Sequence, residues 1–238
     1  MTEILETEIE QFLTPEACID QALEANPGAR ACFTCSFQAE DMVVLHLLRQ
    51  RIPDITVLFL ETGYHFRETY EYRDRMAAEW NLNLVNVMPR ETVAAQEAKL
   101  GILYLVEPAQ CCNLRKVEPL FRSLEPFDLW FTGLRREQSP TRRNLKQIEE
   151  HRLSADKVLS KVSPLAAWTW SEVEQCATEH EIPLLPLYEQ GYTSIGCEPC
   201  TARSTDPANP RAGRWGGKKL ECGIHTFVPQ EATGAAQQ

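Results

Sequence analysis

The stretch from residue 31 to residue 60, ACFTCSFQAEDMVVLHLLRQRIPDITVLFL, decides the fold of this chain. Residues 31–35 form a short apolar run that favours a strand, and residues 55–60 form a continuous apolar run, which is typical of a strand buried on both faces of a parallel sheet. Between them, residues 41–50 place apolar side chains at helical spacing. A strand, a helix and a second buried strand predict a βαβ unit.

The same alternation continues on both sides of this unit. The patterns predict helices over residues 15–25, 66–80, 91–100 and 171–180, and strands over residues 82–87, 128–132 and 158–162. We therefore expect an α/β fold with a doubly wound, mostly parallel sheet. In such sheets, ligands bind beyond the carboxyl ends of the strands, where the topology switches.

The composition and the periodicity of the sequence change after the last expected helix. Residues 183–217 are rich in Pro and Gly and poor in periodicity, and so long an irregular segment is usually functional or mobile. We expect residues 1–200 to form the α/β domain. Residues 201–238 are expected to be a mobile segment of the same domain that does not fold on its own.

Composition excludes several classes of protein. The 24 Lys+Arg and 34 Asp+Glu of the 238 residues give a net charge of −10, which argues against a general nucleic-acid binder. The first ten residues hold four Glu and no basic residue, unlike a targeting peptide, and the most apolar run is too short to span a bilayer. We expect a cytoplasmic protein that binds neither nucleic acid nor membrane.

Nine cysteines are the outstanding compositional feature, and an odd count argues against a disulfide scaffold. Cys111 and Cys112 form one tight pair, and Cys197 and Cys200 form another. Four such thiols could complete the ligand set of a four-iron cluster or of zinc; the alternative is two unrelated pairs of buried thiols. Adjacent cysteines are unusual for zinc, so the spacing favours an iron–sulfur cluster without settling the choice.

Cys222 is the candidate nucleophile. A cysteine reacts as its thiolate, and the nearby cations Arg214, Lys218 and Lys219 favour that form. The alternative is an inert thiol in a basic loop. His225, three residues later, is more typical of a solvated or structural histidine than of a general acid.

The other four cysteines indicate packing. Cys32 and Cys35 form a CxxC motif, but on a strand residues three apart point to opposite faces, so we expect a structural role. Cys18 and Cys176 fall within amphipathic helices and are expected in the core.

Two local excesses of positive charge stand out on this acidic chain. Residues 133–146 and residues 203–219 each hold five basic residues and one acid, a net of +4. Guanidinium groups match phosphate and sulfate, so these islands predict a compact anionic ligand, although either island alone fits a solvated surface. The CSFQAED loop at residues 35–41 follows the first strand and fits either a phosphate-binding turn or an ordinary capped turn.

Taken together, these residues resemble the assimilatory adenylyl-sulfate (APS) and phosphoadenylyl-sulfate (PAPS) reductases over nearly the whole chain. The matching motifs are CSFQAED at 35–41, LETG at 60–63, CCNLRK at 111–116, GLRREQSPTR at 133–142, CxxC at 197–200 and ECGIH at 221–225. The paired cysteines place the chain in the cluster-bearing branch of this family, which uses mainly APS. PAPS stays open as an alternative or additional substrate.

The resemblance implies a fold, an activity and a set of site residues. The fold is that of the adenine-nucleotide α-hydrolases, and the activity reduces APS to sulfite and AMP through an S-sulfonate on Cys222. A [4Fe-4S] cluster would bind Cys111, Cys112, Cys197 and Cys200. The substrate would contact Ser36, Leu60, Gly63, Lys116, Arg142, Arg211 and Arg214. Residues 1–200 would then be the nucleotide-binding reductase domain, and residues 201–238 its catalytic segment.

The resemblance also implies partners, and the sequence departs from the family pattern at one motif. Thioredoxin or glutaredoxin would supply the electrons from outside, because no thioredoxin-like sequence occurs in these 238 residues, and a homo-oligomer stays open. Glu61 stands where the family usually has Asp, which leaves its role undefined. Two other classes compete: an iron–sulfur tRNA-thiolating enzyme of the pyrophosphatase fold, which expects an SGGxDS loop, and a non-catalytic metal-binding or redox-sensing protein, which needs neither Cys222 nor the arginines.

Overall fold

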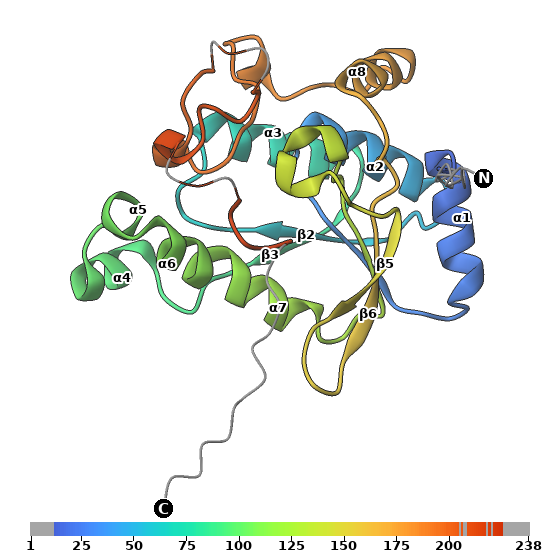
Figure 1. Ribbon diagram of the computed structural model, residues 1–238, viewed down its shortest axis with the longest axis horizontal. Coiled ribbons are helices and arrows are strands. Elements are labelled where there is room, and N and C mark those ends of the chain that lie inside the picture. Colours follow the sequence, from blue (N-terminus) through green and yellow to red (C-terminus); the bar gives the residue numbers. More distant parts are fainter. Residues whose placement is uncertain (1–11, 205, 207–208, 218, 220, 226–238) are drawn as a thin grey trace, which may run out of the picture.

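The computed structural model describes residues 12–204, 206, 209–217, 219 and 221–225, and its centre is a six-stranded sheet (Figure 1). The strand order is β3-β2-β1-β4-β6-β5, with β5 and β6 antiparallel and every other neighbouring pair parallel. The strands are β1 (Ala31–Thr34), β2 (Thr56–Leu60), β3 (Asn83–Val87), β4 (Leu129–Phe131), β5 (Ile148–Arg152) and β6 (Val158–Val162). The expected α/β fold with a mostly parallel sheet is confirmed.

The direction in which successive strands are added to the sheet reverses between β1 and β4, which are themselves parallel. From β1 the chain adds β2 and then β3 on one side, whereas β4 and β6 lie on the other side. The carboxyl ends of β1 and β4 are neighbours, with Phe33 paired to Phe131. This switch point opens the crevice in which doubly wound proteins bind ligands.

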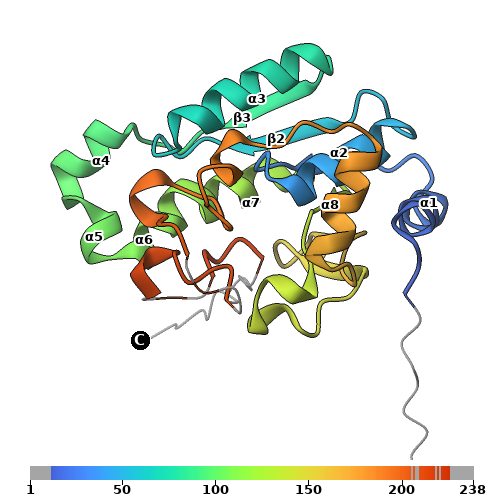
Figure 2. The ribbon, with the colours of Figure 1, turned by 90° about the horizontal axis from the view of Figure 1, so that it is seen from above.

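Helices cover both faces of the sheet (Figures 1 and 2). One face carries α1 (Pro15–Ala25), α2 (Ala39–Arg49), α3 (Arg67–Glu79) and α8 (Trp170–Glu179). The other side carries α4 (Val93–Leu100), α5 (Leu103–Val106), α6 (Pro108–Cys112) and α7 (Glu118–Leu124). Because both faces are covered, the inner strands are apolar throughout, which is why residues 55–60 show no alternation.

Alternating side chains of β1, β2 and β4 pack into two separate hydrophobic cores, one on each face of the sheet. Phe33 and Phe59 pack with α1, α2, α3 and α8, whereas Leu58 and Trp130 pack with α7 on the other face. Cys35 belongs to the first core and Cys32 to the second. These two thiols therefore lie on opposite sides of the sheet, as the strand period predicted, and burial raises the pKa of each.

The predicted elements agree with the structure to within one or two residues at most ends. The first helix begins at Pro15 after the N-cap Thr14, whose side chain accepts a hydrogen bond from Ala17 N at 3.2 Å. Strand β5 and the helices between residues 103 and 124 were not predicted. In the part of the chain that the structure describes, no helix is long and apolar enough to cross a membrane.

Candidate active site

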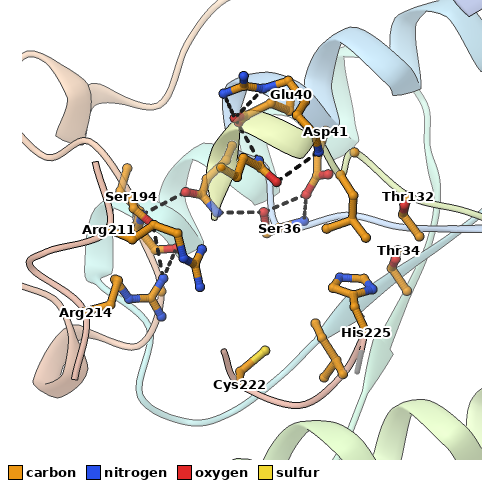
Figure 3. Close-up of a pocket in the computed structure, with 18 of the residues that line it drawn as sticks. Thr34, Ser36, Glu40, Asp41, Thr132, Ser194, Arg211, Arg214, Cys222 and His225 are labelled. Carbon is orange, nitrogen blue, oxygen red and sulfur yellow. Dashed lines mark hydrogen bonds and ion pairs between the residues drawn. The ribbon is translucent and has the colours of Figure 1, made fainter. Parts of the chain in front are cut away.

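A cavity of about 650 Å³ lies at the carboxyl ends of β1 and β4 (Figure 3). This volume is in the range of pockets that hold nucleotide-sized molecules. Its walls come from the loop after β1, from β2, from residues 132–142 after β4, and from three segments remote in sequence: residues 192–196, 210–215 and 222–225. Of the substrate contacts implied by the resemblance, the cavity is lined by Ser36, Leu60, Lys116, Arg142, Arg211 and Arg214.

The loop after β1 is closed by Asp41. One carboxylate oxygen of Asp41 accepts hydrogen bonds from Ser36 N and from Ser36 Oγ, both at 2.6 Å, and Gly133 N also donates to this carboxylate. Burial raises the pKa of Asp41 to about 6, although these hydrogen bonds oppose the shift. Gly133 is required for the close approach, because a Cβ there would lie 3.0 Å from Asp41 N. The loop is thus a capped turn whose Ser36 side chain lines the cavity.

A buried ion pair ties the first turn of α2 to the loop after β4. Glu40 Oε1 accepts hydrogen bonds from Arg135 Nη2 at 2.9 Å and from Arg135 Nε at 3.2 Å. Gln138 Nε2 donates to the same oxygen at 2.9 Å. Arg135 therefore holds the wall of the cavity in place, a role that the sequence analysis did not assign.

The second basic island forms the opposite wall. Arg214 is 5% exposed, donates to Ile195 O at 3.2 Å, and stacks on Trp215 with Cζ 4.4 Å from the ring centroid. Arg211 lies over the same ring at 5.7 Å. Figure 3 shows Arg211 and Arg214 together beside Ser194, at the edge of the cavity. The guanidinium groups of Arg211 and Arg214 thus both contact the Trp215 indole at the same wall of the large cavity.

Cys222 lines the same cavity and is half-buried. It lies near enough to Lys116, Arg211 and Arg214 for its negative charge to act on the pKa of each of them. The thiol thus faces the cationic groups that favour a thiolate. Lys219 lies with Nζ 4.9 Å from the Trp215 ring centroid, and Lys218, also expected near Cys222, lies outside the described residues.

The residues after Cys222 attach it to the α7 side of the sheet. Gly223 has φ +102°, a conformation that glycine adopts readily. Ile224 then packs against the core below the sheet, and the His225 ring stacks on Trp130 at 5.5 Å between centroids. Burial is the main cause that holds the pKa of His225 well below its ordinary value, and Lys161 adds to it. His225 also lines the large cavity, so the solvated or structural role expected for it stays a prediction.

The two cysteine pairs line a second, much smaller cavity of about 10 Å³ next to the first. Cys111 and Cys112 end α6, and Cys197 and Cys200 come from the loop that returns past β2. The pKa of Cys111 is raised to about 12, mainly by burial and to a smaller extent by the charges of Cys112, Cys197 and Cys200. Among the described residues, no group of three His, Cys, Asp or Glu side chains is placed to hold a single metal ion.

A π-helical turn over residues 113–117 directly follows the cysteine pair. Such turns are frequent at functional sites, and here Arg115 and Lys116 line the same small cavity as the cysteines. Arg115 is 3% exposed and donates to Thr62 O and, at 3.0 Å, to Gln96 Oε1. Lys116 lines both cavities and so lies between the cysteines and the larger one.

The LETG motif forms the turn after β2. Glu61 accepts hydrogen bonds from Gly63 N at 2.7 Å and from the Tyr70 hydroxyl at 2.6 Å, and it lies 3.4 Å from Arg73 Nη1. Its carboxylate therefore stabilises the turn. Gly63 has φ +73° and is not among the described residues that line the large cavity, whereas Leu60 is.

Glu221 is the site residue that the sequence analysis did not single out. Its carboxylate accepts hydrogen bonds from Arg142 Nε at 2.9 Å and Arg142 Nη2 at 2.7 Å. Its position directly before Cys222, two residues after the second basic island, is the signal that was available in the sequence.

Comparisons with known proteins agree with this geometry. Residues 30–203 match the phosphoadenosine phosphosulfate reductase domain. The chain is 45% identical over 202 residues to the adenosine 5'-phosphosulfate reductase of Streptomyces coelicolor, which covers 83% of each protein. It is 43% identical over 202 residues to the enzyme of the same name from Geobacillus kaustophilus, covering 83% of this chain and 84% of that protein.

The fold also resembles a solved structure. The crystal structure of phosphoadenylyl-sulfate reductase from Candida auris, in a phosphate complex, superimposes with a TM-score of 0.68 at 26% identity. The match covers 80% of this chain and 91% of that chain. The chain therefore belongs to the phosphoadenosine phosphosulfate reductase family.

Proposed function

We propose that this protein reduces adenylyl sulfate to sulfite and AMP. The observation that carries the proposal is the position of Cys222, which lines a nucleotide-sized cavity beside Lys116, Arg211 and Arg214. The identity of 45% to a relative named adenosine 5'-phosphosulfate reductase supports APS as the substrate.

The chemistry proceeds in two stages. The Cys222 thiolate attacks the sulfur of APS, the bond between that sulfur and the bridging phosphate oxygen breaks, and AMP leaves with its electron pair. A thiolate of the reductant then attacks Cys222 Sγ and releases sulfite, so that the sulfonate sulfur gains two electrons. The second thiol of the reductant resolves the mixed disulfide. The reductant ends as a disulfide, and Cys222 returns as a thiolate.

The cationic residues of the cavity have an electrostatic role in the first stage. Negative charge grows on the AMP phosphate as the bond breaks, and Lys116, Arg211 and Arg214 are placed to offset it. Burial alone would lower the pKa of Lys116, but the thiolate charges of Cys197, Cys222 and Cys112 raise it above the ordinary value. Lys116 therefore carries its positive charge at neutral pH.

We propose that Cys111, Cys112, Cys197 and Cys200 hold a [4Fe-4S] cluster. All four thiols line one cavity, and three of them are less than 9% exposed, which supports a shared group. When bound, the cluster supplies fixed charge next to Lys116 and links α6 to the loop around Cys197.

Thioredoxin or glutaredoxin is the proposed reductant, because a small dithiol protein can reach a half-buried thiol at a cavity edge. A reducing compartment such as the cytoplasm suits these thiols, and the nine cysteines are free in the structure. Residues 201–238 are proposed to open so that the sulfonated Cys222 meets the reductant. Assembly of several copies is compatible with this scheme.

Competition between APS and PAPS tests the substrate assignment. We expect anaerobically prepared, iron-loaded protein to release sulfite from APS with thioredoxin, and kcat/KM for APS to exceed that for PAPS. PAPS is the second candidate because the solved relative from Candida auris is a phosphoadenylyl-sulfate reductase. A higher kcat/KM for PAPS would reverse the assignment, and ATP-dependent tRNA thiolation without sulfite release would replace it.

A further inference from the structure

The carboxylate of Glu221 is held by two of the arginines that the family resemblance assigns to the substrate. Arg142 binds it in a bidentate manner, with Nε 2.9 Å from Oε1 and Nη2 2.7 Å from Oε2. The Thr141 hydroxyl donates to Oε1 at 2.9 Å, and Arg211 Nη2 lies 3.6 Å from Oε2. The side chains of Arg142 and Glu221 are each 10% exposed, so this is a largely buried ion pair.

The ion pair is charged at neutral pH. Burial alone would raise the pKa of Glu221, but the hydrogen bonds and charge of Arg142, together with the charge of Arg211, hold the pKa below its ordinary value. Removing one partner of a buried pair leaves the other charge without compensation, which is costly. The contact between Glu221 and Arg142 is therefore a strong attachment for the chain around residue 221.

Cys222 is fixed on both sides by different interactions. Glu221 attaches the preceding residue to the arginines at the cavity wall, and the following residues attach through Ile224 in the core and His225 on Trp130. Both attachments reach the lining of the large cavity, and the one at Glu221 joins the nucleophile to its cationic groups, Arg142 and Arg211. The third donor nitrogen of Arg142, Nη1, is also engaged, by Gln138 Oε1.

We propose that Glu221 is the positioning residue for Cys222. Its carboxylate binds Arg142 and Arg211, and these contacts hold the Cys222 thiol at the wall of the large cavity. Arg142 accordingly acts on the position of Cys222 through Glu221. Its Nε and Nη2 atoms bind the carboxylate of Glu221. This inference deepens the proposed function and rests on it only where turnover is measured.

Alkylation of Cys222 in the absence of substrate tests the proposal directly. We expect iodoacetamide to modify Cys222 about tenfold faster in iron-loaded Glu221→Gln than in wild type, because the ion pair no longer holds the thiol at the cavity. The rate is followed on the Cys222 peptide by mass spectrometry under anaerobic conditions. Glu150→Gln, the same change at an exposed position of β5, is the matched control and should react like wild type.

Arg142→Gln separates release of the segment from a local charge effect. Removing a positive charge near Cys222 disfavours the thiolate and would slow alkylation, whereas release of the segment speeds it. We expect Arg142→Gln to react faster than wild type, and the double variant to react no faster than the faster single variant. Unchanged or slower alkylation in Arg142→Gln, with an unchanged melting temperature, overturns the proposal.

Nucleotide binding and single-turnover kinetics complete the test. We expect both single variants to bind AMP with unchanged Kd, while the rate of S-sulfonation of Cys222 by APS falls about tenfold in each and no further in the double variant. A tenfold weaker Kd for AMP in Arg142→Gln, with normal alkylation, would show that Arg142 contacts the nucleotide and would refute the inference. If wild type forms no adduct with APS, the proposed function fails, whereas the alkylation rates still decide the role of Glu221.

Discussion

Lys116 joins the two halves of the site at the scale of a single residue. It follows the cysteine pair by one π-helical turn and lines both the small cavity of the cysteines and the large cavity of Cys222. The charges of Cys197, Cys222 and Cys112 raise the pKa of its ammonium above the ordinary value, against the effect of burial. A cation in this position can offset the charge that develops on the leaving phosphate while the cysteines hold it in place.

Loss of Lys116 should impair the reaction without removing the metal. We expect Lys116→Met to lower kcat/KM for APS by about a hundredfold, the scale of losing one preorganised electrostatic partner. Iron content and the visible absorption of the protein should stay at wild-type levels. Lys146→Met, which removes an exposed charge from the first basic island, is the control. Normal turnover by a fully iron-loaded Lys116→Met protein would contradict this role.

His151 makes the fold sensitive to acid. Its ring lies 5.2 Å from Trp130 and 5.6 Å from Phe121, and burial, together with Lys161, lowers its pKa from 6.5 to about 4. The unfolded chain therefore binds a proton at His151 before the folded chain does. Its contribution to stability is complete above pH 6.5 and is lost as the pH falls toward 4.

We expect His151→Leu to flatten this pH dependence. Between pH 7 and pH 4.5, the free energy of unfolding of the wild type should fall by about 2 kcal/mol more than that of the variant. Urea denaturation at the two pH values measures this difference. Parallel losses in both proteins would show that His151 does not titrate in this window.

At the scale of elements, the ion pair of Glu40 and Arg135 fixes α2 to the loop after β4. Both residues are buried, at 8% and 4% exposure. We expect Glu40→Ala to reduce the free energy of unfolding by about 3 kcal/mol, because it removes the partner of a buried guanidinium. The double variant Glu40→Met/Arg135→Met should be more stable than Glu40→Ala, since it leaves no charge unpaired. Urea denaturation in which Glu40→Ala loses less than about 0.5 kcal/mol would contradict this account.

The strongly patterned elements were predictable, and the weakly patterned ones were not. The strand over residues 55–60 and the helix beginning at Pro15 follow from a continuous apolar run and from a capping residue. Strand β5, at the edge of the sheet, has the sequence IEEHR, in which Ile148 is the only apolar residue, so no apolar alternation can appear. Helices α5 and α6 have four and five residues, too few for a helical period to appear.

At the scale of the whole molecule, the contacts that build the site are long-range. Arg142 and Glu221 are 79 residues apart, and His225 stacks on a tryptophan of β4. The spacing of the cysteines and the cations near Cys222 indicated the chemistry of the site from the sequence alone. The sequence did not indicate that Glu221 binds Arg142. A carboxylate beside a cysteine is expected only to disfavour the thiolate, and nothing in the sequence points to a partner 79 residues away.

The net charge of −10 concealed two basic islands, and the fold neutralises part of each. In the first island, Arg135 pairs with Glu40 and Arg142 with Glu221, and in the second island Arg211 lies 3.6 Å from Glu221. Lys116, Arg211 and Arg214 line the cavity together with Cys222. The site therefore gathers positive charge near the nucleophile, and Glu221, directly before Cys222, compensates part of it.

The central claim is that Cys222 takes the sulfonate of APS. The most direct measurement is the intact mass of anaerobically prepared, iron-loaded protein after mixing with APS and no reductant. The account predicts one added sulfonate, located on Cys222 by peptide mapping, absent in Cys222→Ser and lost when reduced thioredoxin is added. No adduct on the wild type, or an adduct that persists in Cys222→Ser, would contradict it.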